Sequence, residues 1–133
     1  MKQKKVKIRA ALDALGRVDF DLDGTKAGEH RLKLGAGEGP HSIGFELHDQ
    51  SGKELRFDTA DPIWAGENCP CPPPEGLSSG QLSISGCDPQ TLMLVNQNSG
   101  APVEIRYQLN FIGADGSLER CDPIMDNGGG NAA

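Results

Sequence analysis

The stretch VEIRYQLNF, residues 103–111, decides the fold class, because apolar and polar side chains alternate along it without a break. Strict alternation is typical of a β-strand with one buried face, whereas a helix needs apolar residues three and four positions apart. The side chains expected on the buried face are Val103, Ile105, Tyr107, Leu109 and Phe111. We therefore expect a long strand whose apolar face covers a hydrophobic core.

Shorter alternating stretches precede this strand along the chain. They are residues 6–12, 18–22, 32–34, 43–47, 55–57 and 82–84, followed by the more continuous TLMLVN at 91–96. Turns rich in glycine, aspartate and serine separate them, and no stretch of helix length sustains a 3.6-residue apolar period. Seven to nine short strands at this spacing predict an all-β fold, an antiparallel β-sandwich of the immunoglobulin-like kind.

The chain of 133 residues fits one domain, which we expect over residues 1–125, with residues 126–133 as a flexible tail of glycine and asparagine. One long loop, residues 58–80, is expected within the domain. It holds five of the nine prolines, the only tryptophan and two of the four cysteines. Loops of this length are uncommon in compact domains and often carry function.

Two segments share one layout, an alternating strand, a turn, a short strand and then an Asp-Pro-Ile step, at residues 61–63 and 122–124. Proline ends each strand because it cannot donate to the ladder. If the two steps are adjacent, Asp61, Trp64 and Asp122 meet the Cys-Pro-Cys segment at one end of the sandwich. If the protein has a binding site, we expect it there, with Trp64 as its apolar anchor. A rigid loop with Trp64 folded down over that end of the core is favoured over this binding role, because a buried tryptophan is usually part of the core.

An acidic pattern lies earlier in the chain, where Asp19, Asp21 and Asp23 are followed by Gly24. It matches the opening of an EF-hand calcium loop, but the twelfth position, which should be acidic, is His30. A strand explains the same residues, because alternation points the three carboxylates outward and Asp-Gly is a common hairpin turn. We favour the strand and keep calcium binding by the three aspartates as the alternative.

The four cysteines allow more than one chemistry. They are Cys69, Cys71, Cys87 and Cys121. In a reducing cytosol they would be thiols or ligands of a thiolate-bound metal, whereas in a secreted protein they would form one or two disulfides. The Cys-Pro-Cys spacing differs from the two-residue gap of a zinc knuckle. Free thiols are the favoured interpretation, with a thiolate metal site and disulfides as alternatives.

The charge balance excludes one large class of partners. The net charge is −6, and five of the 13 basic residues lie in the first nine positions, so the remaining 8 face 19 acidic residues, a balance of −11. An acidic body disfavours nucleic acid, which rewards clustered Lys and Arg. The sequence has neither a signal-peptide pattern nor a long apolar run, so a cytoplasmic location without membrane contact is expected.

No catalytic motif is present: the chain lacks a Gly-x-Ser-x-Gly elbow, a His-Glu-x-x-His pair and a phosphate-binding glycine loop. We therefore expect a non-enzymatic module without a cofactor. The predicted function is recognition of a protein or peptide through the long loop or an exposed sheet edge. The alternative is a metal-binding sandwich, with calcium or a thiolate-bound metal.

The C-terminal stretch IRYQLNFIGADGSLERCDPIMDNGG, residues 105–129, resembles the endings of small bacterial β-sandwich proteins of unknown function. In those endings, a strand with an aromatic residue, a hairpin and an Asp-Pro-Ile step lead into an Asn/Gly tail. The nearest such family is the one called DP-EP. The resemblance implies an immunoglobulin-like fold and implies neither a reaction nor catalytic residues.

Overall fold

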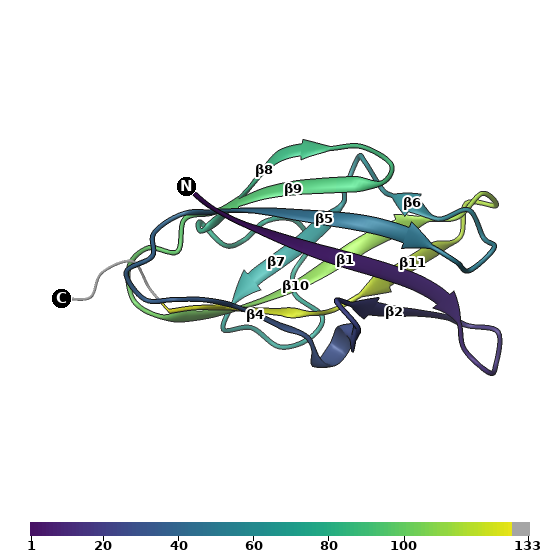
Figure 1. Ribbon diagram of the computed structural model, residues 1–133, viewed down its shortest axis with the longest axis horizontal. Helices are drawn as coiled ribbons and strands as arrows, with labels where there is room; N and C mark the ends of the chain where they lie inside the picture. Colours follow the sequence, from purple (N-terminus) through teal and green to yellow (C-terminus); the bar gives the residue numbers. More distant parts are fainter. Residues whose placement is uncertain (129–133) are drawn as a thin grey trace.

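The strand expected at residues 103–111 is β10 (Val103–Ile112), the centre of one of two sheets in the computed structural model, which describes residues 1–128 (Figure 1). This sheet, called the β10 sheet here, has β11 (Leu118–Cys121) and β12 (Ile124–Asn127) along one side of β10, and β6 (Arg56–Phe57) and β7 (Ile63–Glu67) along the other. Strand β4 (Arg31–Leu34) lies beyond β12.

The second sheet contains the remaining six strands. Their order across the sheet is β3 (Thr25–Lys26), β2 (Val18–Leu22), β1 (Lys2–Leu12), β5 (His41–Asp49), β9 (Thr91–Asn96) and β8 (Leu82–Cys87). One short 3-10 helix, η1 (Ala27–Glu29), connects β3 to β4 and so carries the chain from one sheet to the other. No helix within residues 1–128 is long and apolar enough to cross a membrane.

The prediction of an all-β fold is confirmed, but the sheets are mixed rather than purely antiparallel. Strand β1 pairs with β5 in parallel from Lys2↔His41 to Ala10↔Asp49, and β12 pairs with β4 in parallel. Alternation reports which face of a strand is buried, and it carries no information on the direction of the neighbouring strand. The parallel pairs arise because the chain visits the other sheet between β1 and β5.

Twelve strands are present in the described residues, where the sequence predicts seven to nine. Part of the difference comes from the long loop, because residues 63–67 within it form β7 on the edge of β10. The rest of the loop then folds back on β7, where Ala65 N donates to Gly76 O (2.8 Å) and Ser78 N donates to Ala65 O (2.9 Å). The loop is therefore attached to the β10 sheet twice, through β7 and through the returning segment that is hydrogen-bonded to β7.

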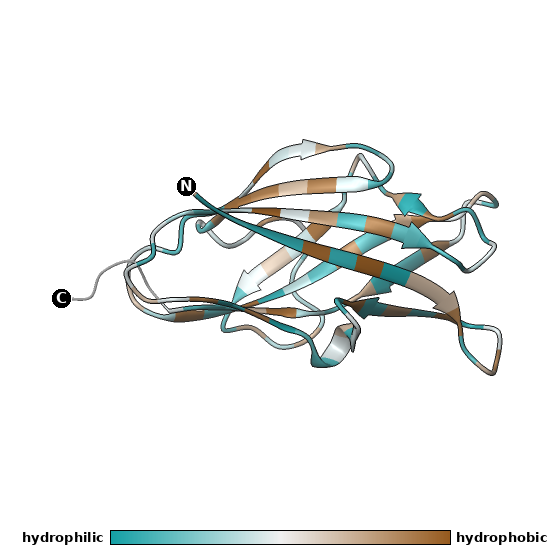
Figure 2. Ribbon diagram, viewed as in Figure 1, coloured by the Kyte–Doolittle hydropathy of each residue, from teal (hydrophilic) through white to brown (hydrophobic). Residues whose placement is uncertain are grey.

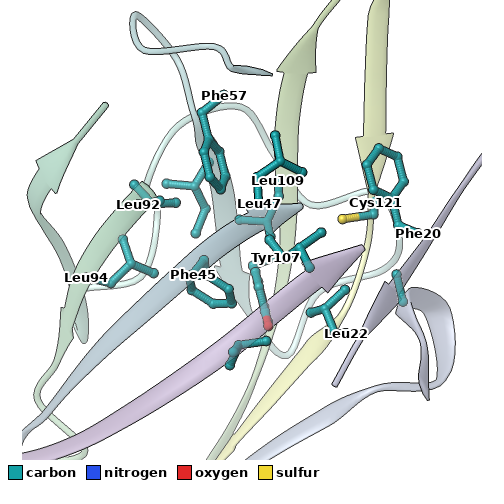
Figure 3. Close-up of a cluster of buried hydrophobic side chains, with 14 of the residues drawn as sticks. Phe20, Leu22, Phe45, Leu47, Phe57, Leu92, Leu94, Tyr107, Leu109 and Cys121 are labelled. Atoms are coloured by element: carbon teal, nitrogen blue, oxygen red, sulfur yellow. The ribbon is translucent and has the colours of Figure 1, made fainter. Parts of the chain in front are cut away.

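The core lies between the two sheets and is built from the alternating faces of their strands. Figure 2 shows the alternation of apolar and polar residues along β1 and β5. The rings of Phe20 and Phe111 stack with centroids 4.8 Å apart, and Phe57 packs on Phe111 at 4.9 Å. Figure 3 shows that this cluster draws side chains from both sheets, with Tyr107 at its centre. The two sheets therefore share one core.

The C-terminal boundary of the domain lies later than predicted. The sequence predicts a flexible tail that includes Asp126 and Asn127, but both belong to β12, where Asn127 pairs with Leu34 and Val103. The side chain of Asn127 is buried, which explains why a polar residue belongs to the domain. Residues 129–133, the rest of the predicted tail, lie outside the described part of the chain.

Candidate functional site

Strand β11 has an open edge. Within residues 1–128 it pairs only with β10, in a ladder from Leu109↔Cys121 to Ile112↔Leu118. The same register continues into the hairpin, where Gly113 N donates to Ser117 O (2.9 Å). Hydrogen-bonded pairs alternate with unbonded pairs in an antiparallel ladder. The backbone N–H and C=O groups of Leu118 and Arg120 therefore point away from β10.

No described strand lies beside the outer edge of β11, because β4 covers β12 and does not extend along β11. Strands β11 and β12 lie in line along β10, and β4 covers only β12. The last bond of the β4–β12 ladder at this end joins Ile124 N to His30 O (3.1 Å). Immediately before His30 the chain turns through η1 and leaves the β10 sheet. A strand continuing the line of β4 would lie beside β11.

A groove of about 470 Å³ occupies this position, bounded by β11, η1 and β2. We call it the β11 groove. Its lining is Val18, Asp19, Phe20, Lys26, Ala27, Gly28, Glu29, Arg120, Cys121 and Asp122. On the β2 wall the N–H of Phe20 is already donated to the Asp19 carboxylate (3.1 Å). The β11 wall contributes the outward N–H and C=O of Arg120 to the groove.

Three other long edges carry features that hinder pairing with another strand. Strand β8 is broken by a bulge between Ile84 and Gly86. The outer edge of β4 carries the exposed side chains of Arg31 and Lys33. The outer edge of β7 is covered by the returning loop at Ala65. Among these edges, β11 alone combines an uncovered backbone with a groove beside it.

Trp64 lies on the outer face of the β10 sheet, next to β11 but outside the core. Its side chain is half-buried, and its Nε1 donates to Asp61 Oδ2 (2.8 Å). The guanidinium carbon of Arg120 lies 5.4 Å from the ring centroid, within the range of a cation–π contact. The interpretation of Trp64 as a buried cover of the core is therefore wrong, because β7 points Ile63 and Ala65 inward and Trp64 outward.

A polar network lies beneath Trp64. Gln108 and Asn110 are buried, and Gln108 Nε2 donates to Asn110 Oδ1. Asn110 Nδ2 donates in turn to the backbone oxygen of Asp61 (2.9 Å), which holds the start of β7 against β10. A cavity of about 70 Å³ between Asp58, Trp64, Leu118 and neighbouring residues opens on this face. Arg120 lines both this cavity and the β11 groove, so it joins the two features.

The two Asp-Pro-Ile steps flank β10 from opposite sides. Asn110 N donates to Pro62 O (2.9 Å), and Tyr107 N donates to Pro123 O (3.2 Å). Asp61 and Asp122 therefore lie on either side of one strand. The two steps are therefore not adjacent, because β10 lies between them.

Asp122 stands at the end of β11 in a partly buried environment. Burial raises the pKa of its carboxyl, and the neighbouring Cys71 thiol and Arg120 guanidinium offset only part of that shift. Its Oδ1 atom is buried and has no hydrogen-bond partner in residues 1–128. Burial, followed by the charge of Asp122, also raises the pKa of the Cys71 thiol. Asp122 thus offers an unused acceptor beside the groove.

The Cys-Pro-Cys segment lies over Gly66 of β7. A Cβ atom on Gly66 would come within 2.9 Å of Cys69 Sγ and 3.1 Å of Pro74 Cδ, so glycine permits this close approach. Cys69 is half-buried against the strand, and Cys71 is exposed beside Asp122. The residues expected to form a site thus lie as two separate pairs, Asp61 with Trp64 and Cys71 with Asp122, on opposite sides of β10.

The three aspartates of the calcium pattern do not converge. Asp21 pairs with Arg9 (2.8 Å), and Asp23 Oδ1 accepts from Lys7 N (2.9 Å). Asp23 and Gly24 have φ values of 50° and 84° between the paired residues Leu22 and Thr25. Positive φ at both central residues is the signature of a type I′ hairpin turn. The strand with an Asp-Gly turn is confirmed.

All four cysteines are free thiols, and they do not converge on one place. Cys87 is on β8 of the second sheet, while Cys69 and Cys71 lie on the outer face of the β10 sheet. Cys121 points into the core beside Phe20 (Figure 3), and burial strongly raises its pKa. Within residues 1–128, no three His, Cys, Asp or Glu side chains are placed to hold one metal ion. The predicted thiolate set is therefore not assembled.

The β11 groove itself was not located from the sequence, which predicted only that some sheet edge would be exposed. The available signal was Pro123, which ends β11 after four residues and leaves Asp122 at its margin. The missing information was the path of β4, because η1 removes the neighbour that β11 would otherwise have. Comparison of the sequence with protein-family models and with curated proteins finds no match.

Proposed function

We propose that this protein recognises an extended segment of another protein, which pairs with the free edge of β11 and lies in the β11 groove. The observation that carries the proposal is the outward backbone of Leu118 and Arg120, together with the groove that lies beside the Arg120 end of β11. Strand addition of this kind uses main-chain hydrogen bonds for affinity and side-chain contacts for specificity.

The expected affinity is modest. Leu118 and Arg120 each offer one N–H and one C=O, and a net backbone hydrogen bond contributes about 0.5–1.5 kcal/mol. Ordering a flexible segment costs free energy that these bonds must first offset. A dissociation constant in roughly the micromolar to millimolar range is therefore expected for a short peptide. Such affinities suit transient recognition.

The test begins with a multivalently displayed library of random octapeptides, because avidity makes weak binders selectable. Peptides enriched on the wild-type protein are then measured against Arg120→Pro and Arg120→Ala. The Arg120 N–H points into the groove, so proline removes this donor and leaves the β10 ladder intact. Alanine keeps the donor and removes the side chain. We expect Arg120→Pro to weaken binding at least tenfold and Arg120→Ala much less.

A second measurement leaves the protein unchanged, in case the proline variant does not fold. Each selected peptide is resynthesised with one backbone N-methyl group at a time. Strand pairing uses alternate N–H groups of the ligand, so methylation should weaken binding at every second position. Failure to enrich any peptide, or uniform tolerance of N-methylation, would overturn the proposal.

We also propose an immunoglobulin-like topology and a cytoplasmic location. The first is supported by two sheets that pack face to face around one core, together with the resemblance to DP-EP endings. The second is supported by four unpaired thiols, which suit a reducing compartment. Both stay predictions, as does the absence of enzymatic activity.

A further inference from the structure

We infer that the segment bound in the β11 groove alternates apolar residues with Lys or Arg. The inference rests on the proposed function and adds the chemistry of the partner. It follows from what the two faces of an added strand would meet. One face would point between the sheets, and the other would point toward solvent.

The inward face of the groove is apolar. Phe20 is 4% exposed, and Val18 and Ala27 lie beside it on β2 and η1. Cys121 of β11 is buried on the same side. Side chains of an added strand that point inward would lie against these apolar groups and cover the half-buried Val18, and a polar side chain there would lose its contact with water. Every second residue of the ligand is therefore apolar.

The remaining lining is acidic. Asp19, Glu29 and Asp122 contribute three carboxylates, against Lys26 and Arg120. Among the described residues none of these carboxylates forms an ion pair, and Asp122 Oδ1 has no hydrogen-bond partner at all. Arg120 is also engaged with the Trp64 ring. Basic side chains supply the missing donors, whereas acidic side chains would add to the repulsion.

The long-range field favours the same partner. Residues 10–133 carry a balance of −11, since 8 basic residues face 19 acidic ones. A field of one sign steers oppositely charged ligands toward the surface and raises the association rate at low salt. None of the basic N-terminal residues lines the groove, and two of them are paired with acids, Lys2 with Glu38 (3.4 Å) and Arg9 with Asp21 (2.8 Å). A basic segment is thus favoured both in encounter and in the bound state.

The test uses four capped heptapeptides as probes: KVKVKVK, EVEVEVE, SVSVSVS and KSKSKSK. Binding is measured by titration calorimetry at 50 and 300 mM salt, with light scattering to check that each peptide is monomeric. We expect KVKVKVK to bind at least tenfold more tightly than SVSVSVS at 50 mM salt and to lose most of this advantage at 300 mM. KSKSKSK should bind weakly, because it lacks the apolar face, and EVEVEVE should not bind.

Variants connect the preference to the groove. Glu29→Gln and Asp122→Asn should each weaken KVKVKVK binding about three- to tenfold and leave SVSVSVS unchanged. Glu75→Gln, on the exposed part of the loop, is the matched control and should change neither. If SVSVSVS or EVEVEVE binds as tightly as KVKVKVK, strand addition stands and the inferred chemistry is wrong. If none of the four binds and the octapeptide library also yields nothing, the proposed function itself fails.

Discussion

Asn96 of β9 and Asn127 of β12 exchange two side-chain amide hydrogen bonds, each 2.8 Å long, between the two sheets. Both residues are buried, and Asn96 Oδ1 also accepts from the backbone N–H of Asn98 (3.0 Å). Each amide satisfies the other, so two polar side chains are accommodated where the core would otherwise require apolar ones. The pair joins the second sheet to the β10 sheet.

Breaking this pair should destabilise the protein. Asn127→Ala leaves the Asn96 amide without its partner in a buried site, which costs about 1–3 kcal/mol. Urea unfolding of both single variants and of the double variant gives the coupling between the residues, expected at about 1 kcal/mol or more. Gln50→Ala on the exposed surface is the control. Additive effects of the two substitutions would contradict a mutually satisfied pair.

The Asp23-Gly24 turn makes a second prediction. Gly24 has φ 84°, and nothing lies within 4 Å of a Cβ placed there, so any cost of Gly24→Ala comes from the backbone. We expect a loss of about 1–2 kcal/mol in the free energy of unfolding. Gly28 has equal space and an ordinary φ, which makes Gly28→Ala the matched control. Equal effects of the two alanines would show that the turn conformation does not constrain stability.

The raised pKa of Asp122 predicts a pH-dependent effect of replacing it. Burial favours the protonated carboxyl in the folded state, so the folded protein holds its proton to higher pH than the unfolded chain does. Stability then falls as pH rises from the unfolded pKa through the folded one. Asp122→Asn should therefore be more stable than wild type at pH 7, and the difference should vanish below about pH 3.5.

Asp49 makes the opposite prediction, because the folded protein lowers the pKa of its carboxyl. Burial alone would raise the pKa of Asp49, but hydrogen bonds from Ser51 and from Leu55 N lower it overall. The stabilisation is present above the unfolded pKa and is lost as pH falls through the folded one. Asp49→Asn should thus be less stable than wild type at pH 7, with a cost that shrinks on acidification. If the stabilities of the two variants relative to wild type changed with pH in the same direction, the environments assigned to Asp122 and Asp49 would be wrong.

Trp64 should be dispensable for folding. Its half-buried ring packs on Arg120 outside the core, so Trp64→Ala should cost only about 1–2 kcal/mol and leave the circular dichroism spectrum of the sheets unchanged. Because Trp64 is the only tryptophan, its fluorescence reports on Arg120. Addition of KVKVKVK should shift the emission of wild type and have a smaller effect on Arg120→Ala. Unfolding of Trp64→Ala would place the ring in the core after all.

Much of the candidate site could be anticipated from residue types, but its arrangement could not. The Asp-Pro-Ile step at 122–124 does end β11, whereas β6 ends at Phe57, before the step at 61–63. Trp64 and Asp122 lie on opposite sides of β10. The acidic pattern could be resolved as a strand because Phe20 and Leu22 needed burial. The β11 groove could not be predicted, because it depends on where β4 begins beside β12. That point is set by η1, a segment without an apolar pattern.

The sequence by itself determined the extended backbone, the buried face of each long strand and the Asp-Gly turn. These follow from period-two alternation and local φ preferences, which act over a few residues. Only the tertiary structure decided that β1 lies parallel to β5, that Asn96 meets Asn127 and that β11 has no outer neighbour. Those relationships join residues 31 or more positions apart, or depend on which sheet the chain enters next. Local sequence patterns do not specify that path. The free edge of β11, which we propose binds a partner, can therefore be identified only from the tertiary structure.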